Sequence, residues 1–150
     1  MAFLKTYLQL CGYFEALPTT VTDLKKVVVG ADEEVLDMQT AQIQYPIMRV
    51  DTPEIRFMDE DDAPKTRYNF RVYVLSNEPK RTNDEANLVL SEMSTLCSKI
   101  IKQLYADADA DKFDIVEGEK PGDAIRAWSG DNDFGWYFNL VIELYTDECA

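Results

Sequence analysis

The chain has 150 residues, 46% of them hydrophobic, and its 28 acidic and 15 basic residues give a formal net charge of −13 at pH 7. This length and hydrophobic content predict one compact domain, able to bury about 70% of the surface that the unfolded chain exposes. The absence of histidine excludes Ser–His and Cys–His nucleophilic systems and imidazole metal sites, and the acidity disfavours sequence-specific binding of DNA or RNA.

The first predicted element is a helix that ends before Pro18. Apolar residues recur there at helical spacing, at Phe3, Tyr7, Leu10, Cys11 and Phe14. They form one stripe to be buried on a sheet or a neighbouring subunit. Polar residues interrupt the segment, so we expect neither a signal peptide nor a membrane span. Cys11, Cys97 and Cys149 lack CxxC spacing, which favours a reducing cytosol over a disulfide framework or a zinc site.

Two strands and a short helix are predicted next. Residues 23–30 form a short apolar segment closed by Gly30, and residues 31–42 are typical of a short helix with acidic residues in its first turn. Residues 46–58 indicate a strand that is bent near Thr52 and Pro53, because proline removes a donor from the ladder. We expect this bend at the edge of a sheet.

The segment 59–65 is predicted to be a protruding hairpin loop, because it is charged and contains a proline. Its four consecutive acids, Asp59, Glu60, Asp61 and Asp62, could hold a divalent ion, but a solvated loop tip is the favoured interpretation. A long strand follows over residues 66–76, with alternate residues on one apolar side: Tyr68, Phe70, Val72 and Val74.

A long amphipathic helix is predicted over residues 82–106. Thr82 and Glu85 have the spacing of a capping box. In this motif the Thr hydroxyl accepts a hydrogen bond from the Glu backbone amide, and the Glu carboxylate accepts one from the Thr backbone amide. A continuous apolar stripe then runs along one side of the helix, formed by Ala86, Val89, Leu90, Met93, Leu96, Cys97, Ile100, Ile101 and Leu104. One buried side is expected of a helix that lies across a sheet.

The acidic segment 107–118 matches only part of a calcium-binding loop. Asp107, Asp109 and Asp111 stand at the first three ligand positions of an EF-hand, but Lys112 replaces the glycine of the turn and Gly118 replaces the bidentate glutamate. Apolar and polar side chains alternate over residues 112–118, as they do in a strand with one buried face. We therefore interpret the segment as a helix end that continues into an acidic turn, with no metal.

The last two predicted strands cover residues 123–128 and 134–145. We expect the first of them to form a hairpin with the strand that precedes it. The second has one apolar side, formed by Phe134, Trp136, Phe138, Leu140, Ile142 and Leu144. Together with the earlier stripes, this pattern predicts a core that contains Phe70, Val72, Val74, Leu90, Met93, Leu96, Ile100, Trp136, Phe138 and Leu140.

The basic residues are interpreted as scattered partner contacts. Short clusters occur at Lys25 and Lys26, at residues 80–81, and at Lys99 and Lys102. None of these clusters forms a patch with interleaved aromatic residues, which nucleic-acid-binding surfaces require. The sequence also has no phosphate loop, nucleophile elbow or zinc-protease motif, so we predict no enzyme, catalytic residue or cofactor.

The order of elements predicts an α+β fold: a mostly antiparallel sheet with one long amphipathic helix and a shorter N-terminal helix packed on it. Residues 45–55, 69–76, 82–106 and 134–144 carry a resemblance to the neck and tail-terminator proteins of tailed bacteriophages, the head–tail connector and tail-completion proteins. The resemblance covers most of the chain after about residue 40.

The resemblance implies a virion structural protein, made in the host cytoplasm, that forms a homo-oligomeric ring of six or twelve copies. Such a ring joins the head and portal to the tail or ends the tail tube, and contacts other neck, portal or tail proteins. DNA passes through its channel without specific binding, and no membrane is involved. Asp59, Glu60, Asp61, Asp62 and Lys65 are then candidates for ring contacts or for lining the channel.

Two other functions stay open on the sequence. A carboxylate-based, metal-dependent hydrolase could use Asp107, Asp109, Asp111 and Asp114, and micromolar binding of one divalent ion would favour it. An acidic regulator that mimics DNA could occupy a basic groove on another protein; this reading predicts a monomer whose complex weakens with salt.

Overall fold

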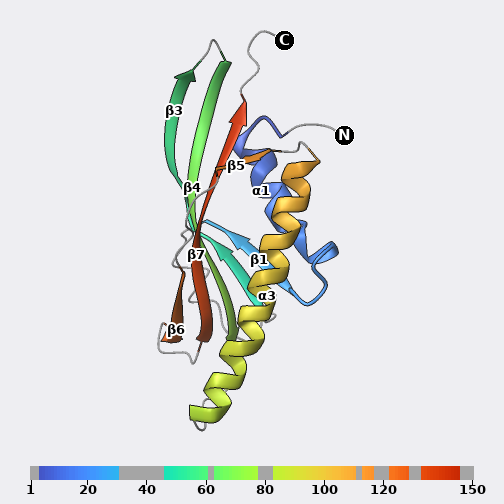
Figure 1. The fold of residues 1–150 in the computed structure, drawn as a ribbon, viewed down its shortest axis with the longest axis vertical. Coiled ribbons are helices and arrows are strands. Elements are labelled where there is room, and N and C mark those ends of the chain that lie inside the picture. Colours follow the sequence, from blue (N-terminus) through green and yellow to red (C-terminus); the bar gives the residue numbers. More distant parts are fainter. Residues whose placement is uncertain are drawn as a thin grey trace.

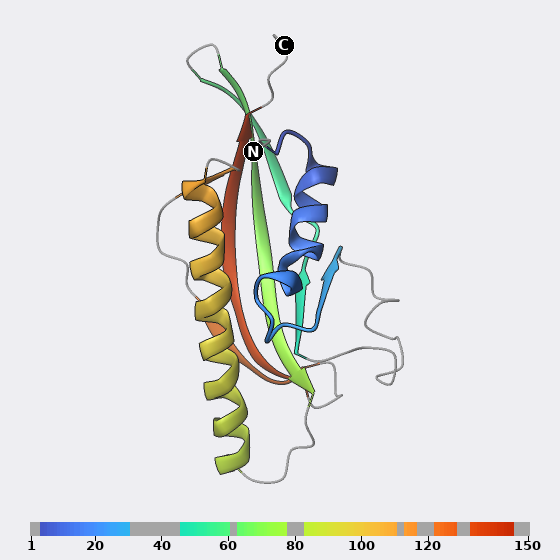
Figure 2. The same cartoon turned by 90° about the vertical axis from the view of Figure 1, so that its right-hand side faces the viewer.

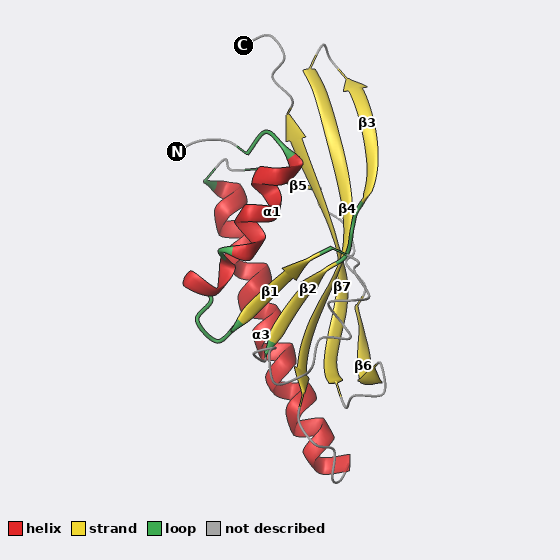
Figure 3. Ribbon diagram, turned by 180° about the vertical axis from the view of Figure 1, so that it is seen from behind, coloured by secondary structure: helices red, strands yellow, loops and turns green. Residues whose placement is uncertain are grey.

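A computed structural model describes residues 4–30, 46–60, 63–77, 83–110, 113–116, 122–128 and 133–145. The elements form one seven-stranded sheet with helices on one face (Figures 1 and 3). In chain order they are α1 (Tyr7–Glu15), the 3₁₀ turn η1 (Leu17–Thr19), β1 (Lys26–Val29), β2 (Ile47–Val50), β3 (Glu54–Glu60), β4 (Ala63–Asn77), α3 (Asn83–Asp109), β5 (Asp114–Ile115), β6 (Gly122–Trp128) and β7 (Asp133–Tyr145). The predicted α+β class is confirmed. The helix predicted over residues 31–42 and its neighbours up to residue 45 lie outside the described residues.

Two long antiparallel strands, β4 and β7, form the centre of the sheet, paired from Lys65 with Tyr145 to Asn77 with Asp133. Each is flanked on its outer side by two shorter strands placed end to end. β2 and β3 both pair with β4, and β5 and β6 both pair with β7. β1 adds a parallel strand beside β2. The interruption between β2 and β3 falls at residues 51–53, where the sequence predicted a bend.

The pairing predicted for β6 was wrong. β6 forms its hairpin with β7, from Gly122 opposite Phe138 to Trp128 opposite Asp133, whereas β5 pairs with β7 at Ile142 and Glu143. β7 is 13 residues long, so its free side accommodates both short strands one after the other. Only residues 129–132 separate β6 from β7 in the sequence, and a connection of this length favours that hairpin over a pairing of β6 with the two-residue β5.

The first helix begins later than its apolar stripe does, because a cap fixes its start. The Gln9 amide donates to Thr6 Oγ1 at 3.1 Å, and the Thr6 amide donates to Gln9 Oε1 at 3.3 Å. This capping box satisfies two amides that lack a partner within the helix. Leu10 and Phe14 of α1 are buried, and the Phe14 ring meets Phe70 of β4 edge-on at 5.1 Å.

The core lies between the sheet and the two helices, with α1 and α3 side by side on the same face (Figure 2). Of the ten residues predicted to form it, nine are buried: Phe70, Val72, Val74, Leu90, Met93, Leu96, Ile100, Phe138 and Leu140. Trp136 is half-buried at the edge of this cluster. Its indole donates a hydrogen bond to the Leu90 carbonyl oxygen at 2.7 Å, which joins β7 to α3 and satisfies the polar tip of a largely apolar side chain.

Cys97 is expected to resist thiol reagents in the folded protein. Burial in α3 raises the pKa of its thiol to about 12, so only about one molecule in 10⁴ carries the thiolate at pH 8. Iodoacetamide labelling followed by mass spectrometry should therefore modify Cys97 at pH 8 only after denaturant is added. The half-buried Cys11 provides an internal comparison. Equal labelling of Cys97 in the folded and the unfolded chain would contradict the buried placement.

Candidate interaction surface

The hairpin formed by β3 and β4 extends beyond the ends of both helices (Figures 1 and 2). Its strands pair from Glu54 opposite Asn69 to Glu60 opposite Ala63. The loop predicted over residues 59–65 is therefore too long: Asp59 and Glu60 belong to β3, Lys65 belongs to β4, and Asp61 and Asp62 lie outside the described residues.

The hairpin also exposes two large apolar side chains that the sequence analysis had not singled out. Phe57 is 83% exposed and Ile55 is 49% exposed. They stand opposite Thr66 and Tyr68, and opposite residues of an antiparallel pair share a face. Tyr68 lies under α1, where its ring stacks on Tyr7 at 5.6 Å. Ile55 and Phe57 thus continue the helix-covered face of the sheet onto a part of the hairpin that neither helix reaches.

The opposite face of the sheet carries cations among tyrosines. We call it the outer sheet face and define it by the alternate residues of β4 and β7 that point away from the helices. In β4 these include Lys65, Arg67, Asn69, Arg71 and Tyr73, and in β7 they include Tyr137, Asn139, Val141, Glu143 and Tyr145. Arg49 of β2 stands opposite Tyr73 and Arg56 of β3 opposite Arg67, so both share this face. It gathers five of the 15 basic residues of the chain.

Several cations of the outer sheet face contact aromatic rings. Lys65 Nζ lies 4.9 Å from the centre of the Tyr145 ring, and the Arg71 guanidinium lies 5.1 Å from the centre of the Tyr137 ring. These distances are in the range of cation–π attraction. The Tyr73 and Tyr137 rings lie 5.9 Å apart. None of these cations belongs to the short basic clusters of the sequence; strand pairing brings together residues that are distant in the chain.

Carboxylates on the same face offset part of this charge. Arg67 forms an ion pair with Glu143 at 2.9 Å, and Arg49, which is 8% exposed, forms one with Asp51 at 3.3 Å. Glu54 and Asp114 stand opposite Asn69 and Glu143. By the strand register, Glu60, Asp123 and Asp133 also fall on this face, so its acidic positions outnumber its five basic ones. Arg71 is exposed, and among the described residues it forms no ion pair.

The first turns of α3 carry a group of exposed acidic residues. Asp84, Glu85 and Glu92 are exposed, and Leu88 between them is 61% exposed. The spacing of four residues places Asp84, Leu88 and Glu92 on one side of the helix. We call these four residues the acidic helix stripe. It faces away from the core because Ala86, Val89, Leu90 and Met93 occupy the buried side.

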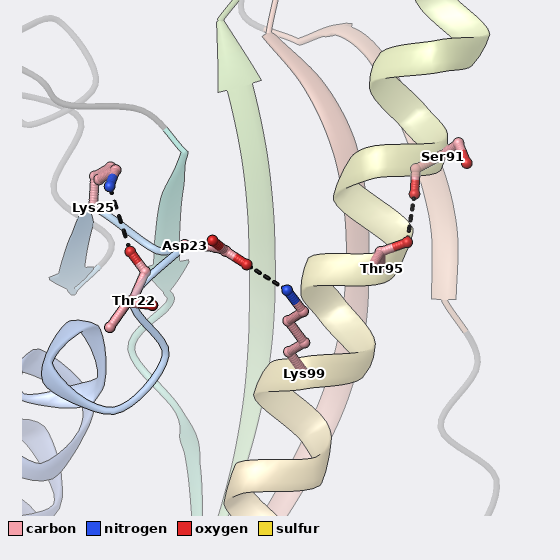
Figure 4. Close-up of polar contacts among 6 residues, drawn as sticks. All are labelled: Thr22, Asp23, Lys25, Ser91, Thr95 and Lys99. Carbon is pink, nitrogen blue, oxygen red and sulfur yellow. Dashed lines mark hydrogen bonds and ion pairs between the residues drawn. The ribbon is translucent and has the colours of Figure 1, made fainter.

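Farther along α3, a contact links the helix to the segment before β1. Lys99 Nζ binds the Asp23 carboxylate, and this hydrogen bond lowers the pKa of Asp23 (Figure 4). An open groove of about 290 Å³ lies beside this contact. Its lining combines Thr20, Val21, Thr22 and Asp23 with Lys99, Lys102, Gln103 and Ala106 of α3. Both ions of the pair are more than half exposed, so we expect it to contribute little to stability.

The described aspartates of the segment 107–118 are not gathered into one site. Asp107 lies in α3, where it accepts hydrogen bonds from the Tyr13 hydroxyl and from Gln103 Nε2. Burial, together with the hydrogen bond to Asp107, raises the pKa of Tyr13. Asp109 ends α3 and Asp114 is in β5, while Asp111 lies outside the described residues. Within the described part of the chain, no three His, Cys, Asp or Glu side chains are grouped to hold a metal ion.

Among the described helices, none combines the length and the apolar character needed to cross a membrane. Comparison of the chain with protein-family models and with curated proteins gives no match.

The candidate surface has three parts: the hairpin with Ile55 and Phe57, the outer sheet face, and the acidic helix stripe.

Proposed function

We propose that the protein is a virion structural subunit that forms a ring at the neck or tail terminus of a tailed bacteriophage. The ring joins the head and portal to the tail, or ends the tail tube, and leaves a channel for DNA. The observation that carries an assembly role is the 83% exposure of Phe57 on a hairpin that extends beyond the helices. A large aromatic side chain exposed beside another apolar residue is typical of a surface that binds a partner.

The strand edges also support a role in assembly. Among the described strands, β1, β3, β5 and β6 each pair along one side only. Edges of this kind can bind another chain, and they differ in sequence and position. Contacts between two different surfaces are head-to-tail, and such contacts close into rings when the rotation between subunits allows it.

The acidity of the chain fits a channel through which DNA moves. With a net charge of −13, most surfaces of the subunit repel phosphates and give DNA no site at which to stop. The acidic end of the β3–β4 hairpin, at Asp59, Glu60, Asp61 and Asp62, would then either line this channel or contact the adjacent subunit.

Electron microscopy of negatively stained protein, combined with light scattering after gel filtration, tests the proposal. We expect annular particles of six or twelve copies, either from the purified protein or at the ends of isolated tail tubes. A monomer that neither forms rings nor binds tubes, but forms a salt-sensitive complex with a basic protein, would instead support the DNA-mimic function. A divalent-dependent hydrolase activity that Asp109→Asn abolishes would support the enzyme.

Replacing the hairpin acids by serine is expected to change assembly without changing the stability of the subunit. The variant carries Ser at positions 59, 60, 61 and 62, and its thermal midpoint should stay nearly unchanged because solvated charges contribute little to folding. Incorporation into virions and infectivity should fall.

The matched control carries Glu15→Ser and Asp109→Ser, two exposed acids on the helices, and should assemble like the parent. If the hairpin variant enters virions as well as the parent does, the hairpin acids have no role in assembly. Calcium-dependent stabilisation of the parent that the variant lacks would show that these acids bind metal.

A further inference from the structure

We infer that two copies of this chain bind each other through one apolar patch, with the hairpin of each copy lying over helix α1 of the other. We call this surface the α1–hairpin patch and define it by Tyr7 and Leu8 of α1 with Ile55 and Phe57 of β3. The inference goes beyond the proposed function, because such a pair forms with or without a ring. Within the proposed ring it makes the copy number twelve, as six pairs.

The hairpin and α1 meet at two stacked tyrosines. The Tyr7 ring of α1 stacks on Tyr68 of β4, with ring centres 5.6 Å apart, and Tyr68 stands opposite Ile55. Phe57 is two residues farther along β3, so it lies on the same face as Ile55. The surface from Tyr7 to Phe57 therefore passes from the helix onto the hairpin without leaving the helix-covered side of the sheet.

Leu8 lies on the side of α1 that is nearer the hairpin. The Tyr13 hydroxyl of α1 donates to Asp107 of α3, so Tyr13 marks the side of α1 that faces α3. Leu8 is five residues before Tyr13, which places it about 140° away around the helix axis. α3 packs on β7 and β4, and β3 pairs with β4 on the side away from β7. Leu8 and β3 thus share the side of the fold that is remote from α3.

The patch holds the two most exposed large apolar side chains in the described part of the chain. Leu8 is 80% exposed and Phe57 is 83% exposed, and Ile55 adds a third side chain at 49%. Apolar side chains gathered on one surface in this way are typical of a binding site, and aromatic residues are enriched at the centre of such sites. A partner that covers them removes their apolar area from water, which stabilises the complex.

The patch carries little charge for a chain of this composition. Lys5 is the one charged residue between positions 4 and 14, and Glu15 follows at the far end of α1. On the hairpin, the strand register places one acid of β3, Asp59, on the face of Phe57, while the other charged residues of β3 alternate onto the outer sheet face. Positions 61 and 62 lie outside the described residues. The described hairpin and the first turns of α1 thus contribute one acid and one base to this surface.

This charge distribution favours a second copy as the partner. Over most of its surface, a chain with a net charge of −13 repels another copy of itself. Acidic positions outnumber basic ones on the outer sheet face, and the acidic helix stripe carries no base. The α1–hairpin patch is the part of the candidate surface where this repulsion is weakest. Asp59 of one copy and Lys5 of the other add charges of opposite sign, whereas a basic partner would select the acidic helix stripe.

The position of the patch makes the contact two-fold. The hairpin and the start of α1 lie at the same end of the molecule, and the hairpin extends beyond the helices there (Figures 1 and 2). One partner therefore covers both halves of the patch, and when each hairpin lies over the other copy's α1, the same surface is used on both sides. β5 and β6 pair on the far side of β7, so their edges stay available for the head-to-tail contacts of a ring.

Serine substitutions inside and outside the patch test the inference. Leu8→Ser and Phe57→Ser each remove one exposed apolar side chain from the patch, and Leu88→Ser repeats the leucine change at an exposed position of α3. Sedimentation equilibrium measures the dimer dissociation constant of each. We expect each patch variant to raise this constant by about a hundredfold or more, since the substituted residue occurs twice across a two-fold contact. Leu88→Ser should leave it unchanged, and equal constants for Leu8→Ser and Leu88→Ser overturn the inference.

Photo-crosslinking locates the contact while keeping an aromatic side chain at position 57. Chains with Phe57→p-benzoylphenylalanine are mixed with isotope-labelled parent chains and irradiated. Mass spectrometry should find the labelled peptide that contains Leu8 joined to position 57. The control has the same replacement at Tyr145, which is 46% exposed on the outer sheet face, and should give no such product. Cross-links from position 57 that all lie outside α1 contradict the inference, as do equal yields from both positions.

The outcomes separate this inference from the proposed function. Dimers that form no rings and bind no tail tubes, and that both patch variants weaken, support the inference and contradict the proposed function. Rings with the same number of copies in the parent and in both patch variants overturn the inference and leave the ring in place. Rings of twelve from the parent and of six from the patch variants support both. A parent that stays monomeric at the highest attainable concentration overturns the inference.

Discussion

Replacing Gly135 by alanine is expected to destabilise the fold by more than about 3 kcal/mol, because the added carbon overlaps the backbone of the central strand pair. Gly135 of β7 stands opposite Leu75 of β4. A Cβ at this position would lie 1.8 Å from the Val74 carbonyl oxygen and 2.8 Å from the Val74 carbonyl carbon. These are backbone atoms of a paired strand, so no side-chain rotation can relieve the overlap, and β4 and β7 must separate.

Gly12→Ala is the matched control for this experiment. Gly12 lies within α1, and a Cβ there would meet no atom within 4 Å. Alanine is the better helix former, so the control should be neutral or more stable by up to about 1 kcal/mol. Urea denaturation followed by circular dichroism measures both free energies of unfolding. A Gly135→Ala protein within about 0.5 kcal/mol of the parent, the usual range for surface changes, would mean that β4 and β7 do not approach so closely.

Replacing the buried side chain of Leu96 or of Ile100 in α3 by alanine is expected to lower the free energy of unfolding by about 2–5 kcal/mol. The loss is this large because the transfer free energy of the removed atoms and the cost of the cavity add. Leu96 is 3% exposed and Ile100 is fully buried, and α3 packs on β4 and β7 at the centre of the core. The measurement is the free energy of unfolding of Leu96→Ala and Ile100→Ala in dilute solution.

Leu88→Ala provides the same chemical change on the exposed side of the same helix. Leu88 is 61% exposed, and its truncation should change stability by no more than about 0.5 kcal/mol. If Leu96→Ala and Ile100→Ala both cost less than about 1 kcal/mol, the apolar side of α3 does not face the sheet.

Local periodicity determined the parts of the fold that were predicted correctly. The apolar stripe of α3 and the alternation in β4 and β7 each decide which side of an element is buried, and nearly all the predicted positions on those sides are buried. The bend before β3 follows from Pro53, whose ring removes a donor from the ladder. These features depend on residues within a few positions of one another, so the sequence alone determined them.

Pairing between distant segments decided the rest. The partner of β6, the extension of the β3–β4 ladder through Asp59 and Glu60, and the close approach at Gly135 all depend on register between strands. The grouping of side chains on the outer sheet face follows from the same register. Arg71 and Tyr137 are 66 positions apart, and they meet because residue 71 of β4 stands opposite residue 139 of β7. Alternation along each strand shows only that these residues point away from the core. Which of them become neighbours depends on the register between paired strands, and that register is fixed by contacts between segments that are distant in the sequence. Only the tertiary structure therefore decides it.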